Sequence, residues 1–185
     1  MTATISPTTG TATWAIDSAH SSAEFSVKHM VVATARGSFG HVEGTLTFDP
    51  ANLTAGNVDA RVKVDTITTN QEQRDAHLKS DDFFSAEQFP WITFQSTKIE
   101  GKGDDIVVHG DLTIRDQTHP VKLNAELDGF VDDSMSKTTR ASFTASGEIS
   151  RQQFGLTWNA LLESGGAVVS DKVKLTLHIA ALLQS

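Results

Sequence analysis

Apolar and polar residues alternate along most of this 185-residue chain, which is the pattern of β-strands that bury one face. The clearest run is residues 58–64, in which valine and alanine alternate with aspartate, arginine and lysine. About eight such runs can be followed. They lie near residues 23–27, 36–48, 58–64, 92–94, 106–114, 121–127, 143–149 and 173–179.

Short polar turns join most of these runs, so consecutive strands are expected to pair as an antiparallel meander. Residues 102–104 and 116–120 are two of the predicted turns, and Gly37, Gly40 and Gly44 predict bends or bulges in the second run. The predicted fold is all-β: an eight-stranded antiparallel up-and-down β-barrel with short helical inserts. A two-sheet sandwich is the alternative, but the long regular alternation favours closure.

Two inserts interrupt the meander, at residues 68–90 and 152–170. The first holds a polar, helical turn and four aromatic residues, which we expect to form one small cluster that fixes the insert on the barrel rim: Phe83, Phe84, Phe89 and Trp91. The second is a candidate gate whose Ser164–Gly166 stretch allows motion, and an ordinary satellite cluster is its alternative. Its apolar residues are Phe154, Leu156, Trp158, Leu161 and Leu162.

Composition and charge narrow the range of possible functions. A net charge of −8 argues against a nucleic-acid partner and against docking on an anionic membrane, and no apolar run approaches the ~20 residues of a membrane span. The chain has no cysteine, and its seven histidines show no metal-ligand spacing. Because no nucleophile–base or nucleotide motif is present either, we expect no metal, no cofactor and no catalytic residue.

The chain is expected to contain one domain, residues 13–185, after a flexible N-terminal tail at residues 1–12. The tail has neither a basic nor an apolar segment of the kind that signal peptides carry, so the expected location is cytoplasmic.

One apolar face of the strands, together with the inserts, supplies the candidate ligand-binding residues: Phe25, Val27, His29, Phe39, Val42, Val62, Phe84, Phe94, Val108, Leu112, Leu123, Phe143 and Trp158. The pattern by itself leaves open whether they line a pocket or fill a solid core. Arg74, Asp75 and His77 are candidates for head-group contacts at the barrel mouth. Their alternative role is to stabilise the insert as a lid.

Several motifs, in order, are similar to those of the YceI-like family of lipocalin-like polyisoprenoid-binding proteins. They include Trp14-x-Ile16-Asp17-x-x-His20-Ser21, the segment Arg74-Asp75-x-His77-Leu78-x-Ser80-x-Asp82-Phe83-Phe84, and Ile149-x-Arg151-x-x-Phe154-Gly155. The resemblance spans roughly residues 13–183. It implies an eight-stranded barrel with an apolar pore that holds a long lipid, and it favours the pocket over the solid core.

The resemblance therefore implies a binding protein that is not an enzyme. Its ligand would be a polyisoprenoid, an isoprenoid quinone or a fatty amide, held for storage, transport or sequestration. Three alternatives stay open: an enzyme acting on an isoprenoid intermediate through His29 or His77, a broad scavenger of hydrophobic compounds, and a solid-cored interaction module. A homodimer formed through exposed apolar rim residues is also left open.

Overall fold

The computed structural model describes residues 9–160 and 168–185. The described chain is almost entirely β-structure, with one α-helix, α1 (Glu72–Lys79), and three single 3-10 turns, η1 (Ser18–His20), η2 (Val64–Thr66) and η3 (Arg151–Phe154). Its strands are β1 (Ala12–Ile16), β2 (Ser22–His29), β3 (Ala33–Phe39), β4 (Val42–Asp49), β5 (Asn52–Lys63), β6 (Ile67–Thr68), β7 (Trp91–Lys102), β8 (Asp105–Ile114), β9 (Gln117–Asp133), β10 (Thr138–Ser150) and β11 (Val169–Leu183).

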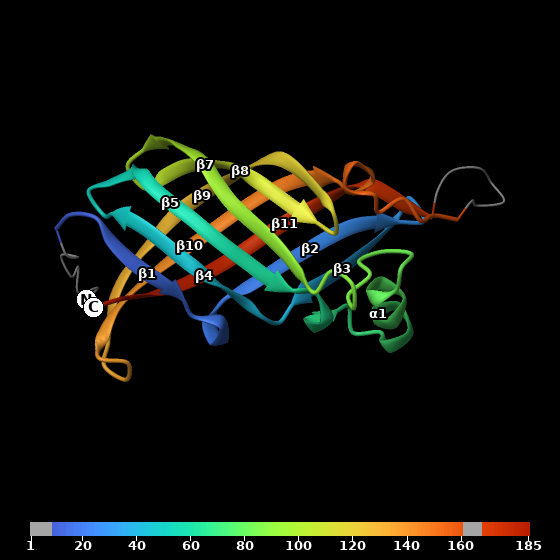
Figure 1. Cartoon of the computed structure of the whole chain (residues 1–185), viewed down its shortest axis with the longest axis horizontal. Coiled ribbons are helices and arrows are strands. Elements are labelled where there is room, and N and C mark those ends of the chain that lie inside the picture. The colour runs from blue at the N-terminus through green and yellow to red at the C-terminus, as the bar shows by residue number, and fades with distance from the viewer. Residues whose placement is uncertain (1–8, 161–167) are drawn as a thin grey trace.

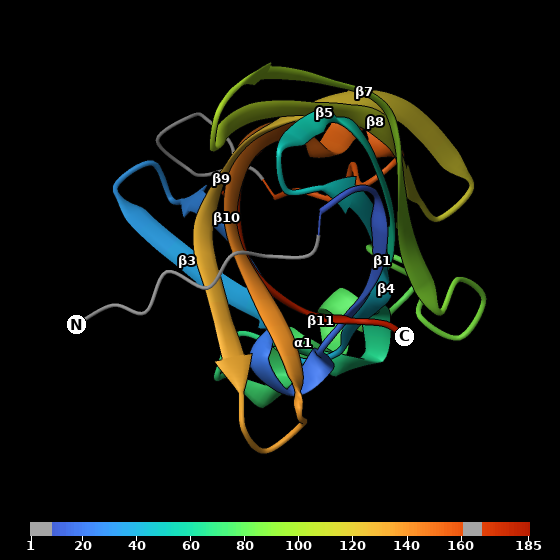
Figure 2. The ribbon, with the colours of Figure 1, turned by 90° about the vertical axis from the view of Figure 1, so that its left-hand side faces the viewer.

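These strands form one sheet that closes on itself. The order is β1-β4-β5-β7-β8-β9-β10-β11-β2-β3-β6, and β11 also pairs with β1, so the sheet returns to its start as a barrel (Figures 1 and 2). Every pairing is antiparallel. The closed antiparallel barrel predicted from the alternation is confirmed.

The count of eight strands also holds, because three of the barrel's strands are each broken in two. β1 and β2 are separated by η1 and pair with successive parts of β11. β3 and β4 continue one another and pair with β2 and β1. β5 and β6 are separated by η2 and pair with β4 and β3. Each break lets the strand bend around the barrel without losing its place in the meander.

A β-bulge in β7 keeps its apolar residues inside the barrel. Ile92 and Phe94 point inward, but beyond the register shift between Ser96 and Lys98 the inward residue is Ile99. Because side chains alternate with a period of two, one extra residue in the strand changes which positions face the core. The Ser96 hydroxyl accepts the Val58 N–H at 2.8 Å beside this bulge.

One predicted turn is wrong in extent. The chain reverses at Arg115 and Asp116, where Arg115 has a φ of 56°, and residues 117–120 already belong to β9, opposite β8. Pro120 lies opposite Asp111. Pairing of β9 with β10 begins at Asn124, so Pro120 sits on a part of the strand whose other edge has no strand partner in the described chain. That position tolerates a residue without an N–H.

The first strand begins one residue inside the predicted tail. Ala12 is already in β1, opposite Phe48, while the first eight residues of the tail lie outside the described part of the chain. β1 brings Trp14 into the barrel, where its side chain has no exposed surface. The Trp14 ring stacks on Phe48 at 5.0 Å between centroids, and Phe130 and Phe143 complete a cluster that closes this end.

An ion-pair group, the Arg140 clamp, ties the same end together. Arg140 donates to Asp17 at 2.6 Å and to Asp133 at 2.7 Å, which joins η1 to the β9–β10 hairpin. Burial raises the pKa of Asp17, but hydrogen bonds from Arg140, His20 and the Ala19 N–H outweigh it and hold that pKa below its ordinary value. The Arg140 hydrogen bond lowers the pKa of Asp133 still further.

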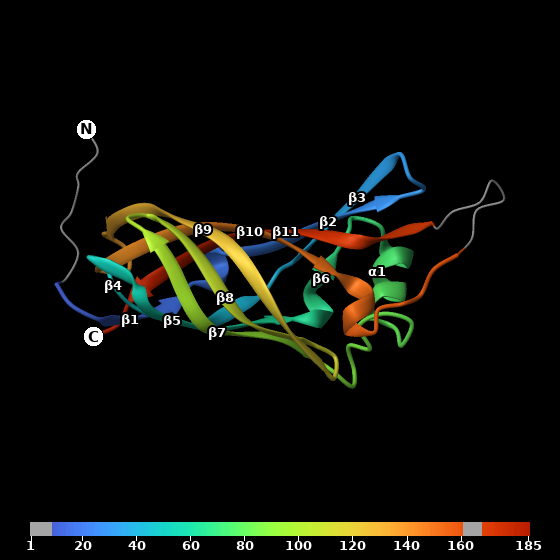
Figure 3. The same cartoon turned by 90° about the horizontal axis from the view of Figure 1, so that it is seen from above.

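The opposite end of the barrel carries the inserts. Figure 3 shows α1, the β2–β3 hairpin, the start of β11 and the η3 turn gathered there, far from both termini. The two ends therefore differ: one is packed with aromatic rings beside the termini, and the other is covered by α1 and the loops around it.

Candidate ligand-binding cavity

A cavity of about 690 Å³ lies inside the barrel. Its lining extends from Leu46 and Leu53, near the β4–β5 hairpin, to Arg74 and His77 on α1. The size is within the ~300–1,000 Å³ of ligand-binding pockets. The choice left open between a solid core and a pocket is thus decided for a pocket.

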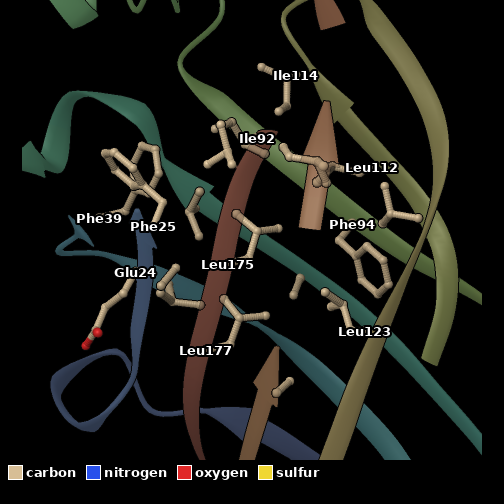
Figure 4. A pocket seen from close by; sticks show the side chains of 18 of the residues that line it. Glu24, Phe25, Phe39, Ile92, Phe94, Leu112, Ile114, Leu123, Leu175 and Leu177 are labelled. Atoms are coloured by element: carbon tan, nitrogen blue, oxygen red, sulfur yellow. The ribbon is translucent and has the colours of Figure 1, made fainter. Parts of the chain in front are cut away.

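The cavity also explains why many inward-facing side chains are only partly buried. Leu175, Leu177 and Ile179 of β11 point into the barrel, yet they stay half-buried because they border open space rather than packed neighbours. Figure 4 shows leucine, isoleucine and phenylalanine side chains converging from several strands, while Glu24 points away. At the end near the termini, by contrast, Trp14, Ala141 and Ala181 have no exposed surface.

All but one of the predicted site residues border this cavity. The strand residues that do so are Phe25, Val27, His29, Phe39, Val42, Val62, Phe94, Val108, Leu112, Leu123 and Phe143. From the inserts come Phe84, Trp158, Arg74 and His77, all toward the α1 end. The exception is Asp75, which is not part of the lining. Whether these residues contact a ligand stays a prediction.

Glycines make room for two phenylalanine rings along the cavity wall. Gly37 lies opposite Phe25, and a Cβ at Gly37 would come within 2.4 Å of the Phe25 ring. Gly110 lies opposite Ser96, diagonal to Phe94, and a Cβ there would also come within 2.4 Å of the Phe94 ring. Gly44 has a positive φ, 144°, as expected of a bend. Gly37 instead leaves space for the Phe25 ring and marks no bulge. The sequence pattern did not separate these two roles.

The start of α1 is fixed by a hydrogen-bond group around the buried Thr69. The Asp75 carboxylate accepts the Thr69 N–H at 2.7 Å and its hydroxyl at 2.5 Å. Arg74 donates to the Thr69 hydroxyl oxygen at 2.8 Å and to its carbonyl at 2.9 Å. Both contacts hold the Asp75 carboxylate on Thr69 and outside the cavity lining, which favours the predicted alternative that Asp75 stabilises the insert; its role stays a prediction. Arg74 combines this structural role with a place in the lining.

The four aromatic residues of the first insert do not form one cluster, so that prediction is wrong. Phe84 enters the barrel and packs on Phe39, with 5.8 Å between ring centroids, while Phe83 packs on Trp158 at 5.4 Å. Phe89 and Trp91 instead lie under the guanidinium groups of Arg115 and Arg61, respectively. Two rings fix the insert, and the other two belong to the outer surface.

His77 sits at the contact between the two inserts. Its ring lies edge-on to Trp158 at 4.7 Å and to Phe83 at 5.1 Å, and its Nε2 is 2.8 Å from an Asp82 carboxylate oxygen. An aspartate rather than the backbone thus orients His77. This orientation leaves the ring on the lining near the mouth.

The second insert is better packed than a gate would be, at least where the structure describes it. Phe154 and Leu156 are buried, with 1% and 4% of their surface exposed, so they belong to the core. Trp158 borders the cavity and contacts His77, and Val168 and Val169 of this insert border the cavity as well. Leu161, Leu162 and the Ser164–Gly166 stretch lie outside the described residues.

Arg151 and Asn159 hold this insert in place, and neither was predicted as a functional residue. Asn159 pairs with both the N–H and the carbonyl of Val169, at 3.0 and 2.7 Å. Arg151 is buried and borders the cavity. It donates to the backbone carbonyls of Leu156 and Val169, and so joins the start of the insert to β11. Its only sequence signal is its place in the motif shared with the YceI-like family.

In residues 9–160 and 168–185, no group of three or more histidine and acidic side chains is placed to hold a metal ion. None of the described helices is long and apolar enough to cross a membrane. The large exposed apolar side chains in this part are Met30, Val31 and Val32 at the β2–β3 tip, with Val131 and Met135 by the β9–β10 hairpin. A homodimer through such residues stays a prediction.

A closed antiparallel barrel that surrounds an elongated apolar cavity defines a lipocalin-like barrel. Comparison with known proteins places the chain further: the YceI-like domain matches residues 14–181, and the chain belongs to that family. A UPF0312 protein of Pectobacterium atrosepticum is 38% identical over 138 residues, which are 75% of this chain and 71% of that protein. A UPF0312 protein of Staphylococcus epidermidis is 34% identical over 158 residues, 85% of this chain and 90% of the relative.

Solved structures share the fold. BcnA of Burkholderia cenocepacia has a TM-score of 0.77 at 22% identity, covering 89% of this chain and 98% of BcnA. The Campylobacter jejuni YceI protein has a TM-score of 0.72 at 26% identity, covering 85% and 90%. A polyisoprenoid-binding domain from Saccharophagus degradans has a TM-score of 0.62 at 13% identity, covering 92% and 98%.

Proposed function

We propose that this protein binds one long apolar lipid inside its barrel and holds it for storage, transport or sequestration. The observation that carries the proposal is the 690 Å³ cavity, lined along the barrel by half-buried aliphatic and aromatic side chains. Each methylene that leaves water for this lining contributes ~0.8 kcal/mol, so many weak contacts suffice for tight binding. The shared fold with the Saccharophagus degradans polyisoprenoid-binding domain makes an isoprenoid lipid the first candidate.

The lipid is proposed to enter at the α1 end. Arg74 and His77 border the cavity there, whereas the other end is filled by Trp14 and its aromatic neighbours. A polar head group can stay near α1 while the tail extends toward Trp14. In this proposal the protein is a carrier and not an enzyme, because His77 is held by Asp82 and by two aromatic rings rather than placed beside a nucleophile.

Native mass spectrometry of the protein purified from its own host, followed by organic extraction, tests this function. We expect one lipid per chain, identified after extraction as an isoprenoid lipid, an isoprenoid quinone or a fatty amide. A protein that is bare after purification, and that also fails to take up polyprenyl lipids when they are offered, contradicts the proposal. Chemical change of the offered lipid, lost in His77→Ala while binding persists, would instead indicate an enzyme.

A further inference from the structure

Arg151 is a positive charge buried beside an apolar cavity. Only 4% of its surface is exposed. Its Nε donates to the Ser170 carbonyl at 2.8 Å, its Nη1 to the carbonyls of Leu156 at 2.5 Å and Trp158 at 2.9 Å, and its Nη2 to the Val169 carbonyl at 3.1 Å. These four contacts fix the plane of the guanidinium and join the chain on both sides of it.

The charge of Arg151 is not matched by a carboxylate in the described part of the chain. Within residues 9–160 and 168–185, no acidic oxygen lies within 4.0 Å of its nitrogens. Asp171 is close enough to act on it, but its carboxylate faces the Ser150 hydroxyl at 2.7 and 2.9 Å and the Gln152 N–H at 3.0 Å. Burial lowers the pKa of Arg151, and Asp171 opposes this only in part. A guanidinium nevertheless stays charged at neutral pH.

A buried charge without a counter-charge is costly, so proteins pair such groups or use them. Arg151 has five N–H donors, of which four meet protein acceptors among the described residues. Arg151 also borders the cavity. Within the described residues, its second Nη2 N–H and its charge have no protein partner, which makes them candidates for contact with a group inside the cavity.

Other polar groups on the lining lie at the same end as Arg151. The Trp158 carbonyl is bound by Arg151, and the Trp158 ring contacts His77 at 4.7 Å. Arg74 is one turn before His77 on α1 and also borders the cavity. Arg74, His77 and Arg151 thus surround the α1 end of a cavity whose remaining wall is mostly apolar.

We propose that Arg151 selects lipids with an anionic head group, a carboxylate or a phosphate, and orients them with the head at the α1 end and the tail toward Trp14. This inference rests on the proposed lipid-binding function and adds the head-group class and the direction of binding. A charge-assisted hydrogen bond to an anion in a low-dielectric site is stronger than one to a neutral hydroxyl. For tails of equal length, we expect an acid to bind roughly 10- to 100-fold more tightly than the alcohol.

The first test measures head-group preference with probes of one tail length: hexadecanoic acid, hexadecanol and hexadecylamine. The wild type should rank them acid, alcohol, amine. Arg151→Met should remove most of the acid's advantage, and Arg151→Lys, which keeps the charge, should retain part of it. Lys172→Met is the matched control, because Lys172 is a cation on β11 that is exposed and does not border the cavity. That variant should keep the wild-type ranking.

The second test needs no change at Arg151 and so does not depend on how that variant folds. Trp158 marks the α1 end of the cavity and Trp14 the opposite end, so variants that keep one of these tryptophans, the other and Trp91 being replaced by phenylalanine, report direction. Stearic acid with a nitroxide near its carboxylate should quench Trp158 more strongly. The same acid with the nitroxide near its terminal methyl should quench Trp14 more strongly.

The outcomes separate the two proposals. If acid, alcohol and amine bind equally, or if the quenching pattern is reversed, the role of Arg151 is refuted while lipid binding stands. If none of these probes binds although polyprenyl lipids do, the role of Arg151 is refuted; if polyprenyl lipids fail to bind as well, the proposed function itself is contradicted. Equal effects of Lys172→Met and Arg151→Met would show that net charge, rather than the buried guanidinium, sets the preference.

Discussion

Replacement of Ala125 by leucine should shorten the longest lipid tail that the barrel accepts. Ala125 borders the cavity on β9, opposite Ile106, and lies by the β7–β8 hairpin at the end far from α1 (Figure 1). If the tail points toward this end, its last carbons lie beside Ala125. Leucine adds about three carbons to the lining, which takes the place of about the same number of tail methylenes.

The expected size of the effect follows from the free energy of burying a methylene. At ~0.8 kcal/mol each, wild-type affinity should rise about fourfold per added methylene until the cavity is full. In Ala125→Leu the rise should stop about three carbons earlier. The longest ligands should then bind roughly 50-fold more weakly, which corresponds to ~2.4 kcal/mol, while short ligands are unaffected.

Displacement of a fluorescent fatty acid by saturated acids of graded length measures these curves. Asn124→Leu is the matched control, because Asn124 is the neighbouring exposed residue on the outer face of the same strand. Coincident wild-type and Ala125→Leu curves would refute the assignment of the tail end. A loss of equal size at every tail length would indicate damage to the fold instead, and a wild-type affinity independent of tail length would contradict binding in the cavity.

Three further substitutions test contacts on the cavity wall, at the barrel end near the termini and at the start of α1. Gly37→Ala should destabilise the protein by ~1–3 kcal/mol in urea unfolding, because its Cβ meets the Phe25 ring, and adding Phe25→Leu should recover part of the loss; simple additivity of the two would contradict the contact. Arg140→Met should lower stability at neutral pH and flatten its acid dependence. The carboxyls of the Arg140 clamp have folded pKa values below their ordinary 3.8, so their stabilisation is present above that pH and is lost as the pH falls through the folded values. An unchanged pH profile in urea would speak against the clamp. Asp75→Asn should weaken the lid by ~1–3 kcal/mol, seen as faster hydrogen exchange at Thr69 than in the wild type, and equal rates would be inconsistent with the Thr69 contacts.

The barrel could be predicted from the sequence because its strands bury one face each. The alternation that Val58 begins, or that Phe143 begins, survives in the structure with the expected side facing inward. The breaks within strands could not be predicted in this way. η1 and η2 interrupt strands whose two halves pair with successive parts of one neighbouring strand, so the breaks follow from the bending of the closed sheet rather than from local sequence.

The cavity wall was predictable for the same reason, since closure brings every inward face to one space. The polar residues were not. The place of Arg151 depends on four backbone carbonyls, two in the segment that follows it and two at the start of β11, and backbone carbonyls leave no mark in a sequence pattern. By their neighbours in sequence, Asp75 was assigned to the mouth and Trp91 to the aromatic cluster of the first insert. Their real partners, Thr69 and Arg61, meet them only in the folded chain.

The size of the cavity also bears on how the protein folds. A dry, unfilled cavity of 690 Å³ would cost on the order of 17 kcal/mol at ~24 cal/mol per Å³, which exceeds the ~5–15 kcal/mol that stabilises a typical domain. Water is a poor occupant, because each buried water needs two to four polar partners and the middle of this barrel is lined by aliphatic and aromatic side chains. An apolar chain restores the missing contacts along its whole length. We therefore expect loading to contribute to stability: removal of bound lipid should lower the melting temperature, and returning a lipid of fitting length should restore it. Equal melting temperatures for the stripped and loaded protein would mean that the barrel carries its cavity without help from an occupant.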